Sequence, residues 1–161
     1  MEAVAQGIAE SLQEESIRAR VEQVRYLGHR LMDAGVPVVR PIGGHAVCLD
    51  ADTILGHIPR ALFPAQVLTA RLYADSGVRG VERGTVSAGR DPVTGENREP
   101  ALELVRLAVP RRVYTRAHID FVADSVIALQ QRRRSITHGL RFTYEPRHLR
   151  FFQARFEPVA L

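Results

Sequence analysis

The chain of 161 residues contains no lysine, because every one of its 22 basic residues is an arginine. Such a uniform choice is more typical of base composition than of function, and we expect most of these arginines on solvated faces. The absence of lysine has one chemical consequence. A lysine amine is the side-chain group that forms a Schiff base with a carbonyl-bearing cofactor. The side chains of this chain therefore cannot hold such a cofactor covalently.

Other features are scarce as well. The single cysteine, Cys48, excludes an internal disulfide framework and fits a reducing compartment. We interpret it as a small buried hydrophobe in a strand rather than a catalytic thiol. No apolar run approaches the roughly 20 residues of a membrane span. The acidic N-terminal stretch lacks the basic region of a secretory signal, so we expect a cytoplasmic protein.

Self-contained catalytic motifs are also missing. The sequence has no GxSxG, HExxH, CxxC or GxxxxGK[ST] motif. The histidines are scattered without the spacing of metal ligands, which predicts no metal site. These residues are His29, His45, His57, His118, His138 and His148. A stand-alone enzyme is therefore poorly supported, whereas half of a shared site remains open.

The hydrophobic pattern predicts an α+β fold, in which a small sheet has helices packed on one face. Helices are expected over 2–34, with a break near 13–16, and over 64–76 and 116–136, the last beginning after Thr115 and ending at Gly139. Strands are expected over 36–41, 43–50, 78–84, 101–110, 140–146 and 149–158, with an exposed loop over 87–100. We expect residues 1–35 to be a connecting helix that leaves a larger body and residues 36–161 to be a small domain.

Two arginines, Arg83 and Arg106, stand in apolar or small-residue surroundings. Arg106 lies between Val105 and Leu107, in a segment that indicates a buried strand. An arginine is rarely buried without a partner, so either an acidic side chain or an acidic ligand should meet it. A structural ion pair and a ligand clamp are equally compatible with this pattern. The neighbouring Arg111 and Arg112 are interpreted as surface residues.

Long motifs add a family resemblance. The strings GGHAVCLDA, VERGTVSAGRDPVTGE and VRLAVPRRVYT, in this order along the chain, closely resemble the C-terminal part of the β-eliminating lyases. This family includes tyrosine phenol-lyases and tryptophanases. The resemblance runs over essentially the whole chain, from MEAVAQG to LRFFQARFEP.

The resemblance implies the small C-terminal domain of a pyridoxal-phosphate-dependent enzyme of the aspartate-aminotransferase fold (fold type I). A missing N-terminal cofactor domain, upstream of Met1 or in a partner subunit, would supply the cofactor lysine, the phosphate site and a K⁺ site. The full-length enzyme would be a homotetramer acting on an aromatic amino acid. This chain alone would be inactive, with no catalytic, cofactor-binding or metal-binding residue of its own.

The resemblance also implies substrate-binding roles. Arg106 matches the arginine that binds the substrate α-carboxylate, and Phe151 and Phe152 match the site that lies against the aromatic ring. Arg83 would meet the phenol oxygen, and His45 would lie near the active-site entrance. Arg83 together with Phe151 favours cleavage of tyrosine to phenol, pyruvate and ammonia, whereas a tryptophanase, yielding indole, is the alternative.

A different class of function is an arginine-rich, non-enzymatic protein that binds nucleic acid. The net charge of +4 would favour such binding. Against it, the arginines are spread along the chain and interleaved with 18 acidic residues, without a basic–aromatic recognition motif. We therefore expect neither nucleic acid nor membrane among the partners.

Overall fold

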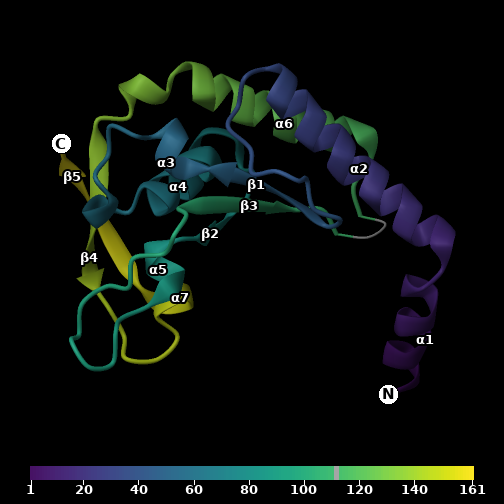
Figure 1. Ribbon diagram of the computed structural model, residues 1–161, viewed down its shortest axis with the longest axis horizontal. Coiled ribbons are helices and arrows are strands. Elements are labelled where there is room, and N and C mark those ends of the chain that lie inside the picture. The colour runs from purple at the N-terminus through teal and green to yellow at the C-terminus, as the bar shows by residue number, and fades with distance from the viewer. Residues whose placement is uncertain (111–112) are drawn as a thin grey trace.

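A computed structural model of the chain describes residues 1–110 and 113–161, which form helices and two small antiparallel sheets (Figure 1). The predicted α+β class is confirmed. The helices are α1 (Glu2–Ser11), α2 (Glu14–Asp33), α3 (Ala51–Ile54), α4 (Pro64–Ser76), α5 (Thr85–Ala88), α6 (Arg116–Gln131) and α7 (Arg150–Gln153). The strands are β1 (Ala46–Asp50), β2 (Val81–Arg83), β3 (Leu104–Ala108), β4 (His138–Tyr144) and β5 (Arg155–Ala160).

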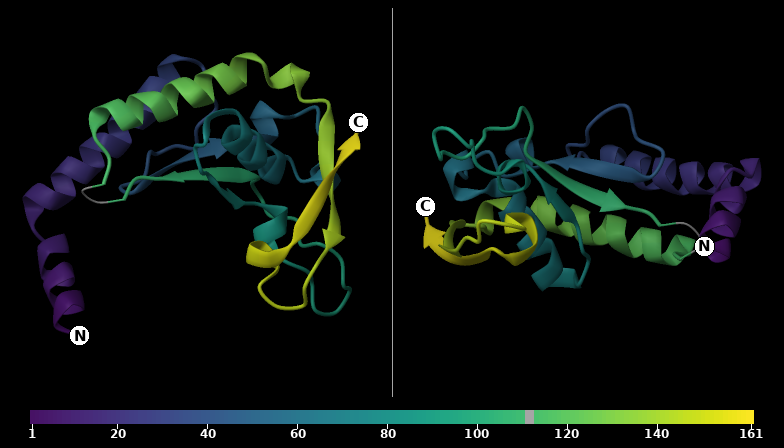
Figure 2. Two further views of the ribbon diagram at one scale, coloured as in Figure 1. Left: turned by 180° about the vertical axis from the view of Figure 1, so that it is seen from behind. Right: turned by 90° about the horizontal axis from the view of Figure 1, so that it is seen from below.

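The larger sheet has three antiparallel strands in the order β1-β3-β2. Helix α2 packs against β1, α4 packs against β2 and β3, and α6 lies against both α2 and α4. Seen from below, the opposite face of the sheet carries none of the long helices that the structure describes (Figure 2). The prediction of helices on one face of a small sheet is therefore confirmed. We call these two faces the covered face and the open face.

Alternation along the strands produces this difference between the faces. Val47, Leu49, Val105 and Leu107 are buried and point toward the helices, while the residues between them are partly buried or exposed, apart from the buried Ala46. Burial of one such side chain contributes about 1.5–3 kcal/mol. The helices add a stripe of buried residues to the same core, including Val24, Leu27, Leu31, Leu68, Leu72, Ile119, Val126 and Leu129.

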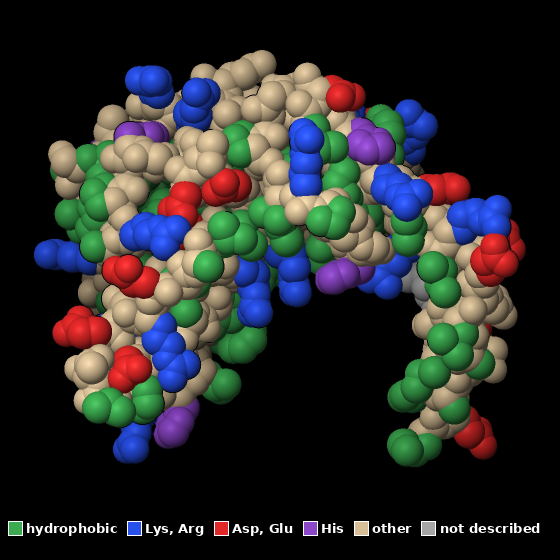
Figure 3. Space-filling view, in the orientation of Figure 1, with side chains coloured by type: hydrophobic (Ala, Val, Ile, Leu, Met, Phe, Trp, Pro, Cys, Tyr) green, Lys and Arg blue, Asp and Glu red, His purple; other side chains and the backbone are tan. Residues whose placement is uncertain are grey.

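The molecule has the shape of an arch (Figure 1). Helix α1 projects at one end, and the β4–β5 hairpin with α5 and α7 projects at the other. The hairpin is attached to the body by Phe63, whose ring lies 4.9 Å from that of Phe142 and 6.0 Å from that of Phe156. Between the two projections the surface is hollowed, and basic side chains gather on its underside (Figure 3).

Several local predictions are confirmed. The first helix breaks at residues 12–13, at the N-terminal edge of the region expected near 13–16. Pro64 begins α4, and Gly77 ends it in the left-handed conformation that favours glycine. Thr115 is the N-cap of α6 and bonds to His118 in a capping box.

No helix among residues 1–110 and 113–161 is long and apolar enough to cross a membrane.

Other predictions were wrong. Helix α6 ends at Gln131, and Arg133–Ser135 form a separate 3₁₀ turn. Gly139 does not end this helix but lies in β4, where a Cβ atom would overlap Leu62. Segment 36–41 contributes only one bridge, from Val38 to Leu49. Arg111 and Arg112 lie outside the described residues.

Candidate functional site

The open face of the three-stranded sheet brings together two of the sequence-predicted residues. Arg106 of β3 lies opposite Cys48 of β1 and Val81 of β2. Arg83, two residues along β2, lies opposite Leu104. Side chains directly opposite each other in an antiparallel pair share a face, so both arginines belong to the open face. They are diagonal neighbours, whose Cα atoms are about 7–8 Å apart.

The thiol of Cys48 reports on the same arrangement. Its partial burial raises the pKa of Cys48, while the nearby charges of Arg106 and Arg83 oppose that rise. Both guanidinium groups are therefore close enough to the thiol for their charges to act on it. Cys48 lies in a strand as predicted, but it is half-buried on the open face rather than buried in the core.

Arg106 has no acidic partner within residues 1–110 and 113–161. Its side chain is half-buried, and its Nε atom is buried without a hydrogen-bond acceptor. Most other arginines with buried surface in this part of the chain do have partners: Arg30 meets Asp120 and Asp124, and Arg60 meets Asp52. Arg106 was expected to meet either an acidic side chain of this chain or an acidic ligand, and no such side chain is found among the described residues. An acidic group from outside the described chain fits the unpaired cation.

Arg83 is exposed, and its guanidinium likewise has no hydrogen bond or ion pair with the described residues. Its backbone, by contrast, is tightly held. Arg83 is the last residue of β2, and the turn into α5 follows at once. Glu82 and Glu103, which are 1% and 0% exposed, accept hydrogen bonds from the backbone of this turn. The side chain is thus free to meet a ligand while its base is fixed.

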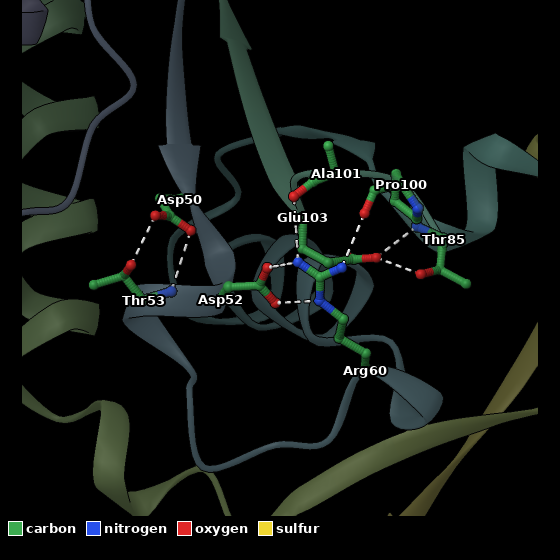
Figure 4. Close-up of polar contacts among 8 residues, drawn as sticks. All are labelled: Asp50, Asp52, Thr53, Arg60, Thr85, Pro100, Ala101 and Glu103. Atoms are coloured by element: carbon green, nitrogen blue, oxygen red, sulfur yellow. Dashed lines mark hydrogen bonds and ion pairs between the residues drawn. The ribbon is translucent and has the colours of Figure 1, made fainter. Parts of the chain in front are cut away.

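Sequence reasoning missed both glutamates. A signal was present, because Glu82 and Glu103 each stand next to apolar residues in predicted strands, where an acid is costly unless it is bonded. Thr85 donates its backbone N–H to Oε1 of Glu103 over 2.7 Å, and its hydroxyl group donates to the same atom (Figure 4). Burial and the charge of Glu103 raise the pKa of Glu82.

Arg60 anchors the segment that leads into β3. It forms an ion pair with Asp52, and it donates to the carbonyl oxygens of Pro100 and Ala101 over 2.9 and 3.4 Å (Figure 4). A guanidinium group suits this role because its donors form a rigid, planar fork. This contact fixes the start of β3, and with it the approach of Glu103 to the turn after Arg83.

Phe151 and Phe152 lie in α7, not in a strand as predicted. Leu149 adopts a left-handed conformation at the N-cap of α7, and this single helical turn precedes β5. The two rings pack edge to face, with centroids 5.1 Å apart. Phe152 is 78% exposed and is not part of the core. Helix α7 packs against α5, which begins two residues after Arg83.

Arg150, which the sequence analysis did not single out, attaches α7 to its surroundings. It is buried, donates to Oδ1 of Asn97 over 2.7 Å, and lies 4.6 Å above the ring of Phe142. Its Nε atom is 3.1 Å from Glu145, which also accepts two hydrogen bonds from Arg90. The bonds from Arg90 and the nearby charge of Arg150 lower the pKa of Glu145.

His45 directly precedes β1, at the end of the strand away from Asp50. Its side chain is exposed, and its carbonyl oxygen accepts from the N–H of Val109. It lies three residues from Cys48, or about 10 Å along the strand. The structure therefore places it at the border of the open face rather than between the two arginines.

The arrangement can bind but has little means to react alone. Two cations without acidic partners among the described residues suit a ligand that carries negative charge or hydrogen-bond acceptors. An aromatic pair, the partly exposed Phe151 and the exposed Phe152, lies on α7, which packs against the short helix that follows Arg83. Residues 1–110 and 113–161 contain no group of His, Cys, Asp or Glu side chains that could hold a metal ion. They also contain no lysine.

Comparison with known proteins adds an independent finding. A family model described as "Beta-eliminating lyase" matches residues 10–125. The chain is 61% identical over 160 residues to a tyrosine phenol-lyase of Symbiobacterium thermophilum, covering 99% of this chain and 35% of that protein. It is 57% identical over 157 residues to a tyrosine phenol-lyase of Nostoc punctiforme, covering 98% of this chain and 33% of that protein. It is 58% identical over 160 residues to a tyrosine phenol-lyase of Pasteurella multocida, covering 99% of this chain and 35% of that protein. The chain thus spans about a third of the length of these relatives.

Proposed function

Since the chain belongs to the β-eliminating lyase family, we propose that it is the C-terminal, substrate-binding segment of a tyrosine phenol-lyase. The complete enzyme would cleave tyrosine to phenol, pyruvate and ammonia in the cytoplasm. Residues 36–161 would form its small domain of the fold type I architecture. Residues 1–35, with the projecting helix α1, would connect this domain to the cofactor domain, and the enzyme would assemble as a tetramer.

Pyridoxal phosphate, with K⁺, belongs to the remainder of the enzyme in this proposal. When bound, the cofactor withdraws electrons from the substrate Cα atom. The residues of this chain do not fit the task of holding it, because no lysine is available for the covalent bond. They fit the substrate instead, and the work of this chain is to bind and orient it.

The observation that carries the proposal is the pair of unpaired arginines on one face of one sheet. Arg106, half-buried on the central strand, would bind the substrate α-carboxylate through two parallel hydrogen bonds. A carboxylate held in this way fixes the direction of the bonds at Cα, which aligns the bond to be broken. Every amino-acid substrate carries this group, so the role of Arg106 would not depend on the side chain.

Arg83 would act at the other end of the substrate. For phenol to leave, the ring carbon that bears the side chain must gain a proton as the bond to Cβ breaks. Electron density from the phenolic oxygen assists this step, and it increases when that oxygen loses its proton or donates it to a strong acceptor. A cation beside the oxygen favours its phenolate form.

Phe151 and Phe152 would form the wall beside the ring and exclude water from it. Their position on α7, which packs against the short helix after Arg83, supports this role. His45 would lie at the entrance, where its exposed ring meets solvent and incoming substrate. The preference for tyrosine over tryptophan rests on Arg83, since indole has no oxygen for it to meet.

The direct test is a product assay on the complete enzyme with tyrosine and tryptophan as competing substrates. We expect phenol and pyruvate, with a higher kcat/KM for tyrosine. A preference for tryptophan, with indole released, would contradict the phenol-lyase assignment and favour the tryptophanase alternative. Binding to nucleic acid in a salt-dependent gel shift, without lyase activity, would favour the remaining alternative.

A further inference from the structure

Two buried carboxylates are devoted to a single turn. Glu82 and Glu103 lie on the covered face at the end of β2, almost without exposure to solvent. Burying a carboxylate costs several kcal/mol unless it is bonded. Neither of them forms an ion pair with the described residues. Their bonds go to the backbone that follows Arg83, and this use of two buried charges needs a reason.

The hydrogen bonds cover four consecutive N–H groups. Glu82 accepts from the N–H groups of Gly84 (2.7 Å), Val86 (3.1 Å) and Ser87 (3.0 Å). Glu103 accepts from the N–H of Thr85 (2.7 Å), between them, and from its hydroxyl group. Hydrogen bonds to an ionised acceptor are about twice as strong as neutral ones. The turn from β2 into α5 is therefore clamped at each residue.

The clamp is also sterically close. A Cβ atom on Gly84 would overlap the Glu103 carboxyl group, so the backbone of the turn rests directly on that carboxylate. The other oxygen of Glu103, Oε2, is buried without a hydrogen bond. Arg60 and Arg150 are near enough to act by charge on Glu103 and Glu82, respectively. The two arginines offset the repulsion between the carboxylates.

Arg83 stands between the strand and this turn. Its backbone is fixed on one side by its pairing with Leu104 and on the other side by the clamped turn. Its side chain is exposed on the open face without a partner among the described residues. Since no hydrogen bond or ion pair with the described residues holds the guanidinium group, its location depends mainly on the backbone.

We propose that Glu82 and Glu103 are positioning residues for Arg83, and that by clamping the turn after it they determine the preference for a phenolic ring. This inference rests on the proposed function. A shift of about 1 Å in a binding group is enough to cost a large factor in rate. The carboxylates never touch substrate, and they act only through the backbone of Arg83.

The test compares two substrates in the complete enzyme. Tyrosine needs Arg83 at its phenolic oxygen, whereas S-methylcysteine has a good leaving group and needs only Arg106. We expect Glu103→Leu to lower kcat/KM for tyrosine at least about tenfold more than for S-methylcysteine. Glu103→Gln, which keeps an acceptor for the Thr85 N–H, should recover most of the loss. Glu157→Gln, in β5, is the control and should change neither value.

A double variant separates positioning from mere stabilisation. If Glu103 acts through Arg83, the tyrosine-selective loss in Arg83→Ala/Glu103→Leu should be no larger than in Arg83→Ala alone. Equal losses on both substrates in Glu103→Leu, or additive selective losses in the double variant, would overturn the inference. If Glu103→Leu does not fold, Thr85→Val removes the hydroxyl donor of the clamp instead. This variant should show a smaller loss that is still selective for tyrosine. No selective loss in Thr85→Val would equally overturn the inference.

Failure of the proposed function would be seen separately, as a wild-type enzyme that does not cleave tyrosine. The inference is then decided by a crystal structure of Glu103→Leu. Displacement of the Arg83 guanidinium with an otherwise unchanged sheet would support the clamp. An unmoved guanidinium would contradict it.

Discussion

The two faces of the three-stranded sheet treat charge in opposite ways. On the covered face, the carboxylates of Glu82 and Glu103 are buried and bonded to the backbone of one turn. On the open face, Arg83 and Arg106 have no acidic partner among residues 1–110 and 113–161. Glu82 and Arg83 are neighbours in β2, and Glu103 directly precedes β3, which carries Arg106. Alternation of side chains along the chain places the glutamates and the arginines on opposite faces. Charge on the covered face holds the backbone, whereas in the proposed function charge on the open face binds a group from outside this chain.

The largest expected effect comes from removing a charge on the open face. Replacing Arg106 by alanine should lower kcat/KM of the complete enzyme for every amino-acid substrate. The loss of one partner of a buried charge pair costs on the order of 2–5 kcal/mol, which corresponds to roughly 30-fold to several thousand-fold. Steady-state kinetics with tyrosine and S-methylcysteine measure it. Arg141→Ala, which removes an exposed ion pair with Glu157, is the control. Near-normal kinetics in Arg106→Ala would remove this residue from the site.

A stability comparison sharpens the difference between the faces. Leu49 points into the core and is fully buried, whereas Leu104 lies on the open face and is partly exposed. Leu49→Ala should lower the free energy of unfolding by about 2–5 kcal/mol, because it leaves a cavity. Leu104→Ala should cost clearly less. Denaturant unfolding of the complete enzyme measures both, and equal losses would mean that the open face is packed as tightly as the covered one.

A smaller effect is expected where α7 is attached, because Glu145 there accepts hydrogen bonds from Arg90 and pairs with Arg150. Its pKa in the folded chain is lowered, first by the hydrogen bond from Arg90. The ionised carboxylate therefore stabilises the fold above the ordinary glutamate pKa of about 4.3, and this contribution is lost as the pH falls through and below that value. Glu145→Gln should cost about 1.5–3 kcal/mol at pH 7. The difference from wild type in thermal unfolding should shrink as the pH falls below about 4. A difference that is constant with pH would contradict the role of the ionised carboxylate.

The smallest effect is an expected absence of reaction. Borohydride reduction of the complete enzyme with pyridoxal phosphate should leave no phosphopyridoxyl group on any side chain of residues 1–161, because none of them is a lysine. Peptide mapping by mass spectrometry measures this. A labelled side chain within this segment would show that the chain contributes to cofactor binding after all.

The sequence was sufficient for features that follow from local chemistry. The α+β class, the start of α4 at Pro64, its end at Gly77 and the cap at Thr115 each depend on residues close together in the chain. It was also sufficient to single out Arg106, since an arginine between apolar strand residues is unusual whatever its partners are.

Features that depend on distant residues were missed. The pairing that places Arg83 diagonal to Arg106 requires the register of β2 on β3, which no local pattern determines. The helical turn at Phe151 depends on Arg150, which is held by Asn97 and Glu145 from other segments. Gly139 resembled a helix stop, but its need for glycine comes from the side chain of Leu62.

The central claim is that the two arginines divide the substrate between them, and one measurement tests it directly. For Arg83→Ala and Arg106→Ala, the ratio of kcat/KM for tyrosine to kcat/KM for S-methylcysteine is compared with that of the wild-type complete enzyme. We predict that Arg83→Ala lowers this ratio roughly 100- to 1,000-fold, the loss typical of removing one charge-stabilising donor. Arg106→Ala should leave the ratio nearly unchanged. An unchanged ratio in Arg83→Ala, or a collapsed ratio in Arg106→Ala, would contradict the claim.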